Sequence, residues 1–347
     1  LSVGKKQGMA DRTHFCARLE NRSRPGLFDW AKPSMIGALA GWMSPAGAGA
    51  RLSALIFHRV LPEPDSLFPA DMHAGRFDEI CERLRVWFNV LPADEAVQRL
   101  KAGTLPARAA CITFDDGYAD NCHVAVPILR RHGLTAAFFI STGFMNGGRM
   151  WNDTIIESVR ACPLPELDLS SLGLGSHAMG SIQDRRAAIA ALIGKIKYQP
   201  FEQRIAVTER LAQLAQVQLP ENLMVTSDDV RAMRRAGMQI GAHTMSHPIL
   251  AKLTDSQARH EIRGSKDFLE QLLDERVGLF AYPNGKPGED YTAQNVETVR
   301  SLGFDAAFST QWGASRSGDD MFQIRRFTPW DQTNWRFGLR MLNNFHT

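Results

Sequence analysis

Short apolar runs recur along residues 54–309 and are separated by longer segments that mix apolar and polar positions. Most of these runs are rich in β-branched or aromatic residues, a composition typical of buried strands. The run 109–114, for example, contains a single polar residue, Thr113. The predicted strands are 54–57, 88–91, 109–114, 136–140, 238–242, 279–282 and 306–309.

Amphipathic segments occupy most of the gaps between these strands and predict helices. Two of the helices are preceded by the spacing of a capping box, at Thr226 and at Thr254. Asp120 or Asn121 is expected to cap the helix that follows strand 109–114. Alternating strands and helices predict an α/β fold with a mainly parallel sheet. The predicted helices are 77–86, 93–101, 121–132, 230–236, 256–273 and 293–302.

The region between Cys162 and Leu219 contains no apolar run that predicts a strand. Residues 185–216 have a helical pattern, and Pro200 is expected to interrupt it because proline lacks a backbone N–H. We therefore expect an inserted helical lobe, at about 162–222, between the fourth and fifth strands. A lid or one wall of a binding groove would suit such an insertion.

Residues 1–51 differ from the rest of the chain. The segment 1–32 is basic and rich in turn-forming residues, 35–43 is apolar, and 44–50 is mostly small. This order resembles either a signal peptide or a short helix followed by a flexible linker. The apolar stretch contains two glycines and starts far from residue 1, which favours helix and linker, and it is too short to span a bilayer. We expect 1–51 to be a tail, helix and linker, and 52–345 to be the main domain.

Composition limits the class of protein. A chain of 347 residues can hold one α/β barrel with additions. A formal net charge of +3 without a long basic cluster gives no indication of a nucleic-acid partner. Five cysteines without Cys-x-x-Cys spacing suit a reducing compartment better than a disulfide scaffold. We expect a cytoplasmic protein, although the signal-like segment 35–50 leaves export open. The sequence gives no indication of the oligomeric state.

The segment Thr113-Phe114-Asp115-Asp116-Gly117 follows a predicted buried strand. Two adjacent carboxylates at the end of such a strand are unfavourable unless a cation or a hydrogen-bond network holds them. A metal would allow one carboxylate to act as a ligand while its neighbour moves protons. The alternative is a plain turn, in which both carboxylates cap local backbone groups.

A second polar segment, Ala242-His243-Thr244-Met245-Ser246-His247-Pro248, follows another predicted strand. Two histidines four residues apart can converge if the loop coils through a helical turn. With Asp116 they would form a three-ligand set that leaves positions open for water and substrate. Histidine nitrogens with one carboxylate favour zinc, or a neighbouring divalent transition metal, over calcium or magnesium.

These two segments resemble the first two motifs of the polysaccharide deacetylases, the NodB-homology domains of carbohydrate esterase family 4. Phe280-Ala281-Tyr282-Pro283-Asn284-Gly285 lies where the third motif of that family should fall. The resemblance covers roughly residues 52–330 and implies a distorted (β/α)7 barrel of the NodB-homology type, here with an inserted helical lobe. It implies a metal-dependent hydrolase that removes acetyl groups from N-acetylated sugars of a polysaccharide or glycan precursor. In this mapping Asp115 is the general base, and Asp116, His243 and His247 bind the metal, most simply zinc.

The chain departs from the family pattern at two places. Ala281 stands where the third motif usually has an arginine that holds the catalytic aspartate. No histidine is found around 322–327, where the family's last motif supplies the general acid. Two alternatives therefore stay open: a catalytically impaired carbohydrate-binding protein, and a metal-dependent hydrolase of small cyclic amides.

His58 is the candidate for the missing general acid, or for a group that orients it. It ends the strand 54–57 and should face the same barrel mouth as Asp115 and His243, because parallel barrels place their sites at the carboxyl ends of strands. Arg59 is considered as a replacement partner of Asp115. Against this, adjacent strand residues point to opposite faces.

Four further residues are candidate substrate contacts. Tyr118 follows the first motif, Trp151 could stack on a sugar face, and Asp153 could bind hydroxyl groups. Trp151 in the core and Asp153 as a helix cap are the alternatives. The loop at Asn284 is expected, by resemblance, to offer a backbone N–H to an oxyanion. Trp312, Trp330 and Trp335 are expected to be packing residues, and His123 and His132 ordinary surface or interface histidines.

Overall fold

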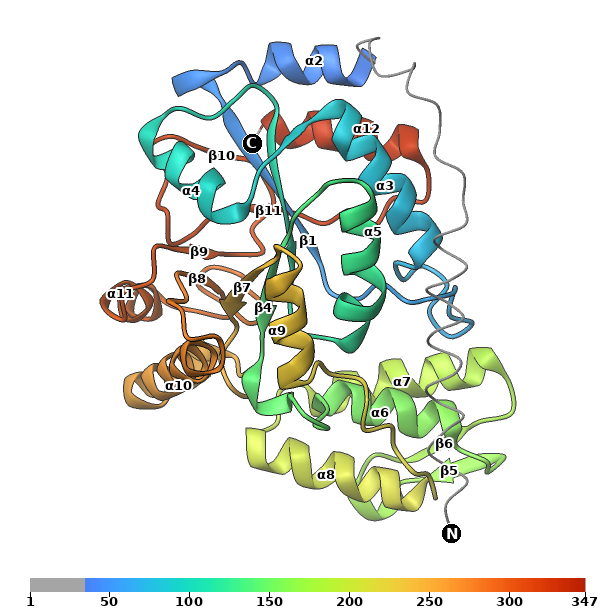
Figure 1. Ribbon diagram of the computed structural model, residues 1–347. Coiled ribbons are helices and arrows are strands. Elements are labelled where there is room, and N and C mark those ends of the chain that lie inside the picture. Colours follow the sequence, from blue (N-terminus) through green and yellow to red (C-terminus); the bar gives the residue numbers. More distant parts are fainter. Residues whose placement is uncertain (1–34, 347) are drawn as a thin grey trace. The chain divides into compact units, whose positions relative to one another are not determined.

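A curled, mainly parallel sheet forms the centre of the protein (Figure 1). The computed structural model describes residues 35–346, so the tail predicted at 1–32 lies outside the described residues. All seven predicted strands are present, although β2 (Asn89–Val90) is short and pairs only with β3. The other six follow the order β1-β3-β4-β7-β8-β9, each parallel to its neighbour. Their bounds are β1 Arg51–Phe57, β3 Ala109–Phe114, β4 Ala137–Ile140, β7 Gln239–Ala242, β8 Leu279–Ala281 and β9 Ala306–Phe308.

A late segment of the chain closes this sheet into a barrel. The strand β11 (Arg326–Phe327) runs parallel to β1. Just before it, Ile324 forms a parallel bridge to Phe308 of β9. This segment therefore joins the two ends of the row of strands, as the predicted (β/α)7 barrel requires. The short strand β10 (Ser315–Arg316) adds an antiparallel pair to β1.

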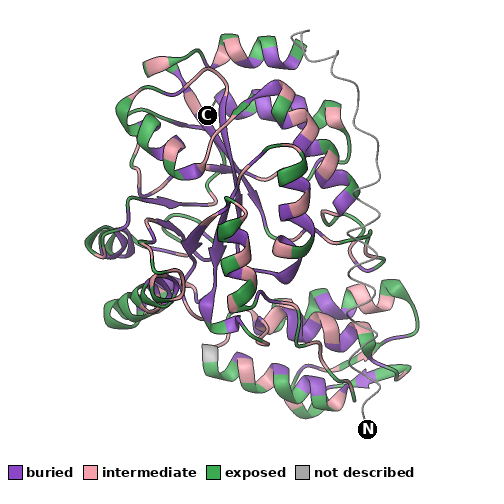
Figure 2. Cartoon of the chain, in the orientation of Figure 1, coloured by how far each residue is buried: buried purple, intermediate pink, exposed green. Residues whose placement is uncertain are grey.

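The interior of the barrel is packed with small and aromatic apolar side chains, and the strands are buried along their length (Figure 2). Alternate residues of each strand point inward, so each strand contributes to one core. Cys111 is fully buried there as a small hydrophobic residue. The group also includes Leu52, Ala54, Ala137, Phe139, Leu279, Ala281, Ala306, Phe308 and Ile324.

Helices follow the strands and cover the outside of the barrel (Figure 1). The capping boxes predicted at Thr226 and Thr254 are confirmed, and both side chains accept a hydrogen bond from the backbone three residues on. The predicted helix 121–132 begins as a π-helical segment, η2 (Asn121–Ala125). The other helices around the barrel are α3 Ala74–Trp87, α4 Ala93–Ala102, α5 Val126–Arg131, α9 Ser227–Arg235, α10 Asp255–Leu273, α11 Ala293–Ser301 and α12 Asn334–Asn343. Short 3₁₀ turns are η1 Gly47–Gly49, η3 Thr142–Phe144, η4 Ser170–Leu172, η5 Leu250–Lys252 and η6 Asn344–His346.

The capping role predicted for Asp120 or Asn121 is wrong, because neither side chain caps η2. The carboxylate of Asp120 instead accepts a hydrogen bond from the backbone of Val60 at 3.0 Å and pairs with Arg59. Asn121 donates to the carbonyl oxygen of His58 at 2.9 Å. Both residues thus hold the loop after β1 rather than the start of a helix.

The predicted helical lobe is present between β4 and β7, but the expectation that it lacks strands is wrong. It contains an antiparallel hairpin, β5 (Glu166–Asp168) and β6 (Ser176–Ala178). Three helices surround the hairpin, namely α6 Trp151–Ala161, α7 Ile182–Ile196 and α8 Phe201–Leu214, with Pro200 between the last two as predicted. The lobe has its own apolar core, which includes Ile155, Leu167, Leu192 and Leu211.

The apolar segment 35–43 forms the predicted short helix, α2 (Met35–Met43). It packs on α12, where a Cβ added to Gly338 would lie 3.2 Å from Ile36. Within residues 35–346, no helix has the length and apolar character needed to cross a membrane.

Candidate metal centre and active site

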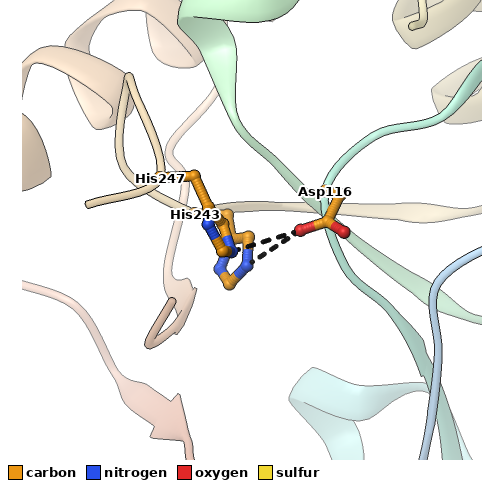
Figure 3. Close-up of side chains that lie close together, drawn as sticks. All are labelled: Asp116, His243 and His247. Carbon is orange, nitrogen blue, oxygen red and sulfur yellow. Dashed lines mark ion pairs between the residues drawn. The ribbon is translucent and has the colours of Figure 1, made fainter. Parts of the chain in front are cut away.

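Asp116, His243 and His247 come together at the carboxyl ends of two barrel strands (Figure 3). Asp116 follows β3, and both histidines lie in the loop after β7. Oδ1 of Asp116 lies 3.4 Å from Nε2 of each histidine. The three ligand atoms are within 4.8 Å of one another, a spacing that a single divalent ion could bridge.

The backbone of both loops is held in an uncommon conformation. Asp116 has a φ of 76°, and in the histidine loop Thr244 and His247 have φ values of 65° and 51°. Non-glycine residues in this region are under strain and persist where the surroundings impose it, often at functional sites. Here the left-handed residues coil the loop so that two side chains four positions apart face one carboxylate.

Hydrogen bonds fix the orientation of the histidine loop. Nδ1 of His243 lies 2.7 Å from the carbonyl oxygen of Ala281, so Nδ1–H donates there and Nε2 is presented to Asp116. The carboxylate of Glu261, on α10, accepts from the backbone N–H groups of Met245 and Ser246, each at 2.9 Å. The backbone of His247 donates to the hydroxyl of Thr244 at 3.1 Å.

The electrostatics of Asp116 and His247 fit a cation. For His243, burial would lower the pKa, but the charges of Asp115 and Asp116 raise it above its usual value. Burial would raise the pKa of Asp116, but its interactions with His243 and His247 hold this pKa below its usual range. Burial lowers the pKa of His247 to about 4, so its imidazole is neutral near pH 7. Oδ1 of Asp116 is a buried acceptor without a hydrogen bond from the described residues. An ionised carboxylate with an unused oxygen, next to a neutral imidazole, is the state in which such ligands take up a divalent metal.

Asp115 has a different partner from its neighbour. Its two carboxylate oxygens accept from the guanidinium of Arg326 at 2.7 and 2.8 Å, a bidentate pair. Arg326 is 1% exposed and also donates to the carbonyl oxygen of Ser309. Burial would raise the pKa of Asp115, whereas the charge of Arg326 lowers it and the net direction is downward. Asp115 is therefore an ionised, fixed carboxylate next to the cluster.

Sequence reasoning missed Arg326. Ala281 is buried in the barrel core, so no guanidinium enters from the third-motif strand, and β11 supplies one instead. The proposal that Arg59 replaces it is wrong, because Arg59 pairs with Asp120 at 2.8 Å and lies over the ring of Tyr118. A signal was present, since Arg326 is two residues after the apolar Ile324 and so shares its inward face in a strand.

His58 lies at the mouth of the barrel, directly after β1. It is exposed, and it lines a cavity of about 300 Å³ together with Asp115, Asp116 and both histidines. It also borders an adjoining cavity of about 450 Å³. His58 therefore lies where the sequence predicted it. Its role as a general acid, or as a group that orients one, stays a prediction.

The four candidate substrate contacts divide between these two cavities. Trp151 and Asn284 line the cavity that holds the histidines. Tyr118 and Asp153 line the adjoining cavity, where the hydroxyl of Tyr118 donates to Asp153 at 3.2 Å. Burial raises the pKa of Asp153 to about 7. Asp153 makes no capping hydrogen bond to α6, so the alternative of a helix cap loses its support.

Trp312, Trp330 and Trp335 are 37%, 65% and 55% exposed, so the prediction that they are packing residues is wrong. His123 and His132 are, as expected, surface and interface residues, paired with Asp229 and Asp78 respectively.

Fold and site together define the class as a NodB-type (β/α) barrel with its titratable residues at the carboxyl ends of the strands. The sequence model of the family described as "Polysaccharide deacetylase" matches residues 102–166 and 181–307, and the chain belongs to that family. The unmatched gap contains the β5–β6 hairpin of the lobe except for its first residue, Glu166.

Individual relatives are distant. The chain is 21% identical over 240 residues to YxkH of Bacillus subtilis, a protein assigned to the polysaccharide deacetylases; the match covers 69% of this chain and 58% of YxkH. Among solved structures, it is similar to the Streptococcus pyogenes deacetylase PplD in complex with acetate, with 17% identity and a TM-score of 0.57 over 84% of this chain and 98% of PplD. It is also similar to IcaB from Ammonifex degensii, with 18% identity and a TM-score of 0.56 over 88% and 99%. At these identities the structural likeness establishes the fold.

Proposed function

We propose that the protein is a metal-dependent hydrolase that removes acetyl groups from N-acetylated sugars of a polysaccharide or glycan precursor. The observation that carries this proposal is the separation of two adjacent carboxylates. Asp116 faces His243 and His247, while Asp115 is held by Arg326. A ligand set beside an independently fixed carboxylate suits hydrolysis, in which one group binds a metal and another accepts a proton.

Asp116, His243 and His247 would hold the metal, and zinc suits two imidazoles with one carboxylate. When bound, such an ion polarises an acetyl carbonyl and lowers the pKa of a water molecule. Asp115 is the proposed general base, because its carboxylate is ionised and Arg326 fixes its direction. Arg326 is a positioning residue in this scheme.

His58 is the proposed general acid, which would protonate the leaving amine. An exposed imidazole at the barrel mouth can exchange protons with solvent, and imidazole is a common general acid. The backbone of the loop at Asn284, which lines the same cavity, is the proposed donor to the developing oxyanion. Trp151 would bind one face of the sugar, while Tyr118 and Asp153 would contact a neighbouring part of the glycan in the adjoining cavity.

Two features support a deacetylase over the alternatives. A protein that only binds carbohydrate would not need a buried arginine on Asp115, and burying such a pair is costly unless it has a role. A hydrolase of small cyclic amides would suit an enclosed pocket. Here two adjoining cavities share His58, Asp116 and Asn152, and the exposed Trp330 borders one of them, which supports a larger ligand.

Acetate release from a panel of acetylated oligosaccharides tests the proposal directly. The protein is first treated with a chelator, and zinc or another divalent metal is then added back. We expect activity to disappear and return. His243→Ala or His247→Ala should remove both bound metal and activity, whereas His260→Ala, an exposed change on α10 outside the site, should change neither. Full metal occupancy in either site variant would contradict the ligand assignment.

A further inference from the structure

The helical lobe contributes two cationic side chains to the cavity that holds the histidine cluster. Lys197 follows α7, and Arg204 lies in the first turns of α8. Both line this cavity together with residues of the barrel mouth such as His247 and Asn284. The carboxylates that line the same cavity are Asp115 and Asp116, which belong to the site already described. The lobe side of the cavity is therefore basic.

Arg204 is held in a defined position. Its guanidinium lies over the ring of Trp151, 5.2 Å from the ring centroid, and Nη1 donates to the carbonyl oxygen of Lys197 at 3.4 Å. The residue is only 6% exposed. Burial lowers its pKa, because the charged form loses hydration. An anion that enters the cavity would offset this loss of hydration.

Lys197 occupies the turn between α7 and α8 and is half-buried. Its ammonium group lies 5.5 Å from the ring centroid of Tyr198. Lysine supplies a compact charge on a flexible stem, whereas arginine supplies a planar fork of donors. The two together can bind an oxyanion that has more than one acceptor oxygen.

The adjoining cavity is different in its charges. Its arginines, Arg59 and Arg160, each form an ion pair, with Asp120 and Asp65 respectively. Asp71 and Asp153 line it as well. A ligand that extends across both cavities would therefore meet the positive charges of Lys197 and Arg204 in one cavity and the carboxylates of Asp71 and Asp153 in the other. This difference in charge would fix the orientation of the substrate along the two cavities.

We propose that the substrate carries an anionic group, a phosphate or a carboxylate, next to the acetylated sugar, and that Lys197 and Arg204 bind this group. The inference rests on the proposed function and narrows its substrate class to anionic glycans or anionic glycan precursors. The lobe then acts as a specificity element, since the metal cluster itself lies on the barrel.

Binding to the chelated, metal-free protein tests the inference without any catalytic step. The probes are N-acetylglucosamine 1-phosphate, a tetrasaccharide that alternates glucuronate with N-acetylglucosamine, and the neutral tetrasaccharide of N-acetylglucosamine. Isothermal titration calorimetry measures the three affinities. We expect one anionic probe or both to bind more tightly than the neutral one. A preference for the first identifies phosphate as the group, and a preference for the second identifies carboxylate.

Lys197→Gln should weaken binding of the preferred anionic probe about tenfold, the loss expected for one charge-assisted hydrogen bond, and leave the neutral probe unchanged. Arg210→Gln is the matched control, because Arg210 is exposed on α8 and bonds Gln213 outside the cavity. Arg204→Lys keeps the charge of a buried residue and should weaken the same probe. Thermal denaturation verifies that each variant is folded.

Equal binding of neutral and anionic probes, or an unchanged preference in folded Lys197→Gln, would overturn the inference. Acetate release with zinc added back is measured separately on the same probes. If no probe releases acetate although the anionic preference and its loss in Lys197→Gln are found, the proposed function fails and the anion site stands. If acetate is released but the neutral and anionic probes bind equally, the proposed function stands and the anion site fails.

Discussion

Asp115 and Asp116 are adjacent residues of the same type, but their side chains have different surroundings. Both follow β3, and both are buried. Both lie beyond the last residue of the strand, and the left-handed φ of Asp116 turns the chain there. Asp115 is held by Arg326, whereas Asp116 faces the two histidines, of which His243 also lies 3.9 Å from Asp115. Two carboxylates that would repel one another thereby have different nearest partners.

Asp115→Asn should retain the metal and lose about 10²–10⁴-fold in acetate release, because the amide cannot accept a proton. Metal analysis and steady-state kinetics on the same preparation check this. Loss of the metal in the variant would make Asp115 a ligand and contradict the assignment of the two aspartates.

Asp153 offers a test at the level of stability and pH. Its pKa of about 7 in the folded protein lies above the ordinary value near 4. The folded state therefore holds its proton longer than the unfolded state does, and stability should fall as the pH rises from about 4 to 7. In the metal-free protein, Asp153→Asn should be more stable than the wild type at pH 8 by roughly 2–4 kcal/mol, while binding substrate less well.

Urea denaturation at pH 5 and pH 8 measures this effect. Asp267→Asn, an exposed change on α10, serves as the control and should behave as the wild type does at both values. A stability difference for Asp153→Asn that is the same at pH 5 and pH 8 would contradict the shifted pKa.

The candidate ligand residues could be proposed from sequence because they stand in short motifs directly after strands. Arg326 could not be assigned to Asp115 in the same way. The two residues are separated by 211 positions, and their pairing depends on which strand lies beside β1. Ala281 stands where the family usually has an arginine, so the sequence indicated that this arginine was missing. It did not indicate which other residue would pair with Asp115.

At the scale of elements, α10 holds the histidine loop in its strained conformation. Glu261 binds two backbone N–H groups of the loop and also the hydroxyl of Ser246 at 2.6 Å. Gly264, one turn later, is in close contact with the side chain of Met245. Helix and loop therefore pack against one another, and the positions of His243 and His247 depend on α10.

Glu261→Ala should weaken zinc binding about 10–100-fold without loss of the fold, because groups that orient metal ligands typically contribute this much. Competition with a chromophoric chelator measures the affinity. Asp267→Ala, exposed on the same helix, is the matched control. An unchanged affinity in Glu261→Ala would indicate that the loop holds its own geometry.

Elements differed in how well the sequence predicted them. Strand β3 has the predicted bounds, 109–114, because a fully buried strand of this length is a continuous apolar run. The hairpin β5–β6 and the strands β10 and β11 were missed. Each contains only two or three residues, too few for an alternating pattern to appear, and long-range pairing decides their conformation.

At the scale of the whole molecule, the strand that closes the barrel also carries the partner of Asp115. Arg326→Met would leave a buried carboxylate without its counter-charge and should lower the free energy of unfolding at pH 7 by about 3–5 kcal/mol. The double variant with Asp115→Asn should recover much of this loss, because no buried charge remains. Urea denaturation of both variants measures these differences.

The matched control is Arg325→Met, a half-buried neighbour whose change should have a small effect. The deficit of Arg326→Met should shrink as the pH falls, because Asp115 without its guanidinium can take up a proton. A single variant as stable as the wild type at pH 7 would show that the pair does not contribute to the closure of the barrel.

The position of Arg326 along the chain also has a consequence for biosynthesis. A nascent chain synthesised as far as β9 already contains Asp115, Asp116 and both histidines, but not the guanidinium that fixes the base. Arg326 can reach Asp115 only after the segment 324–327 has been synthesised and has paired with β9 and β1. The proposed hydrolytic activity would therefore require the complete barrel, and a product truncated before this strand would carry the proposed metal ligands without the partner of the proposed base.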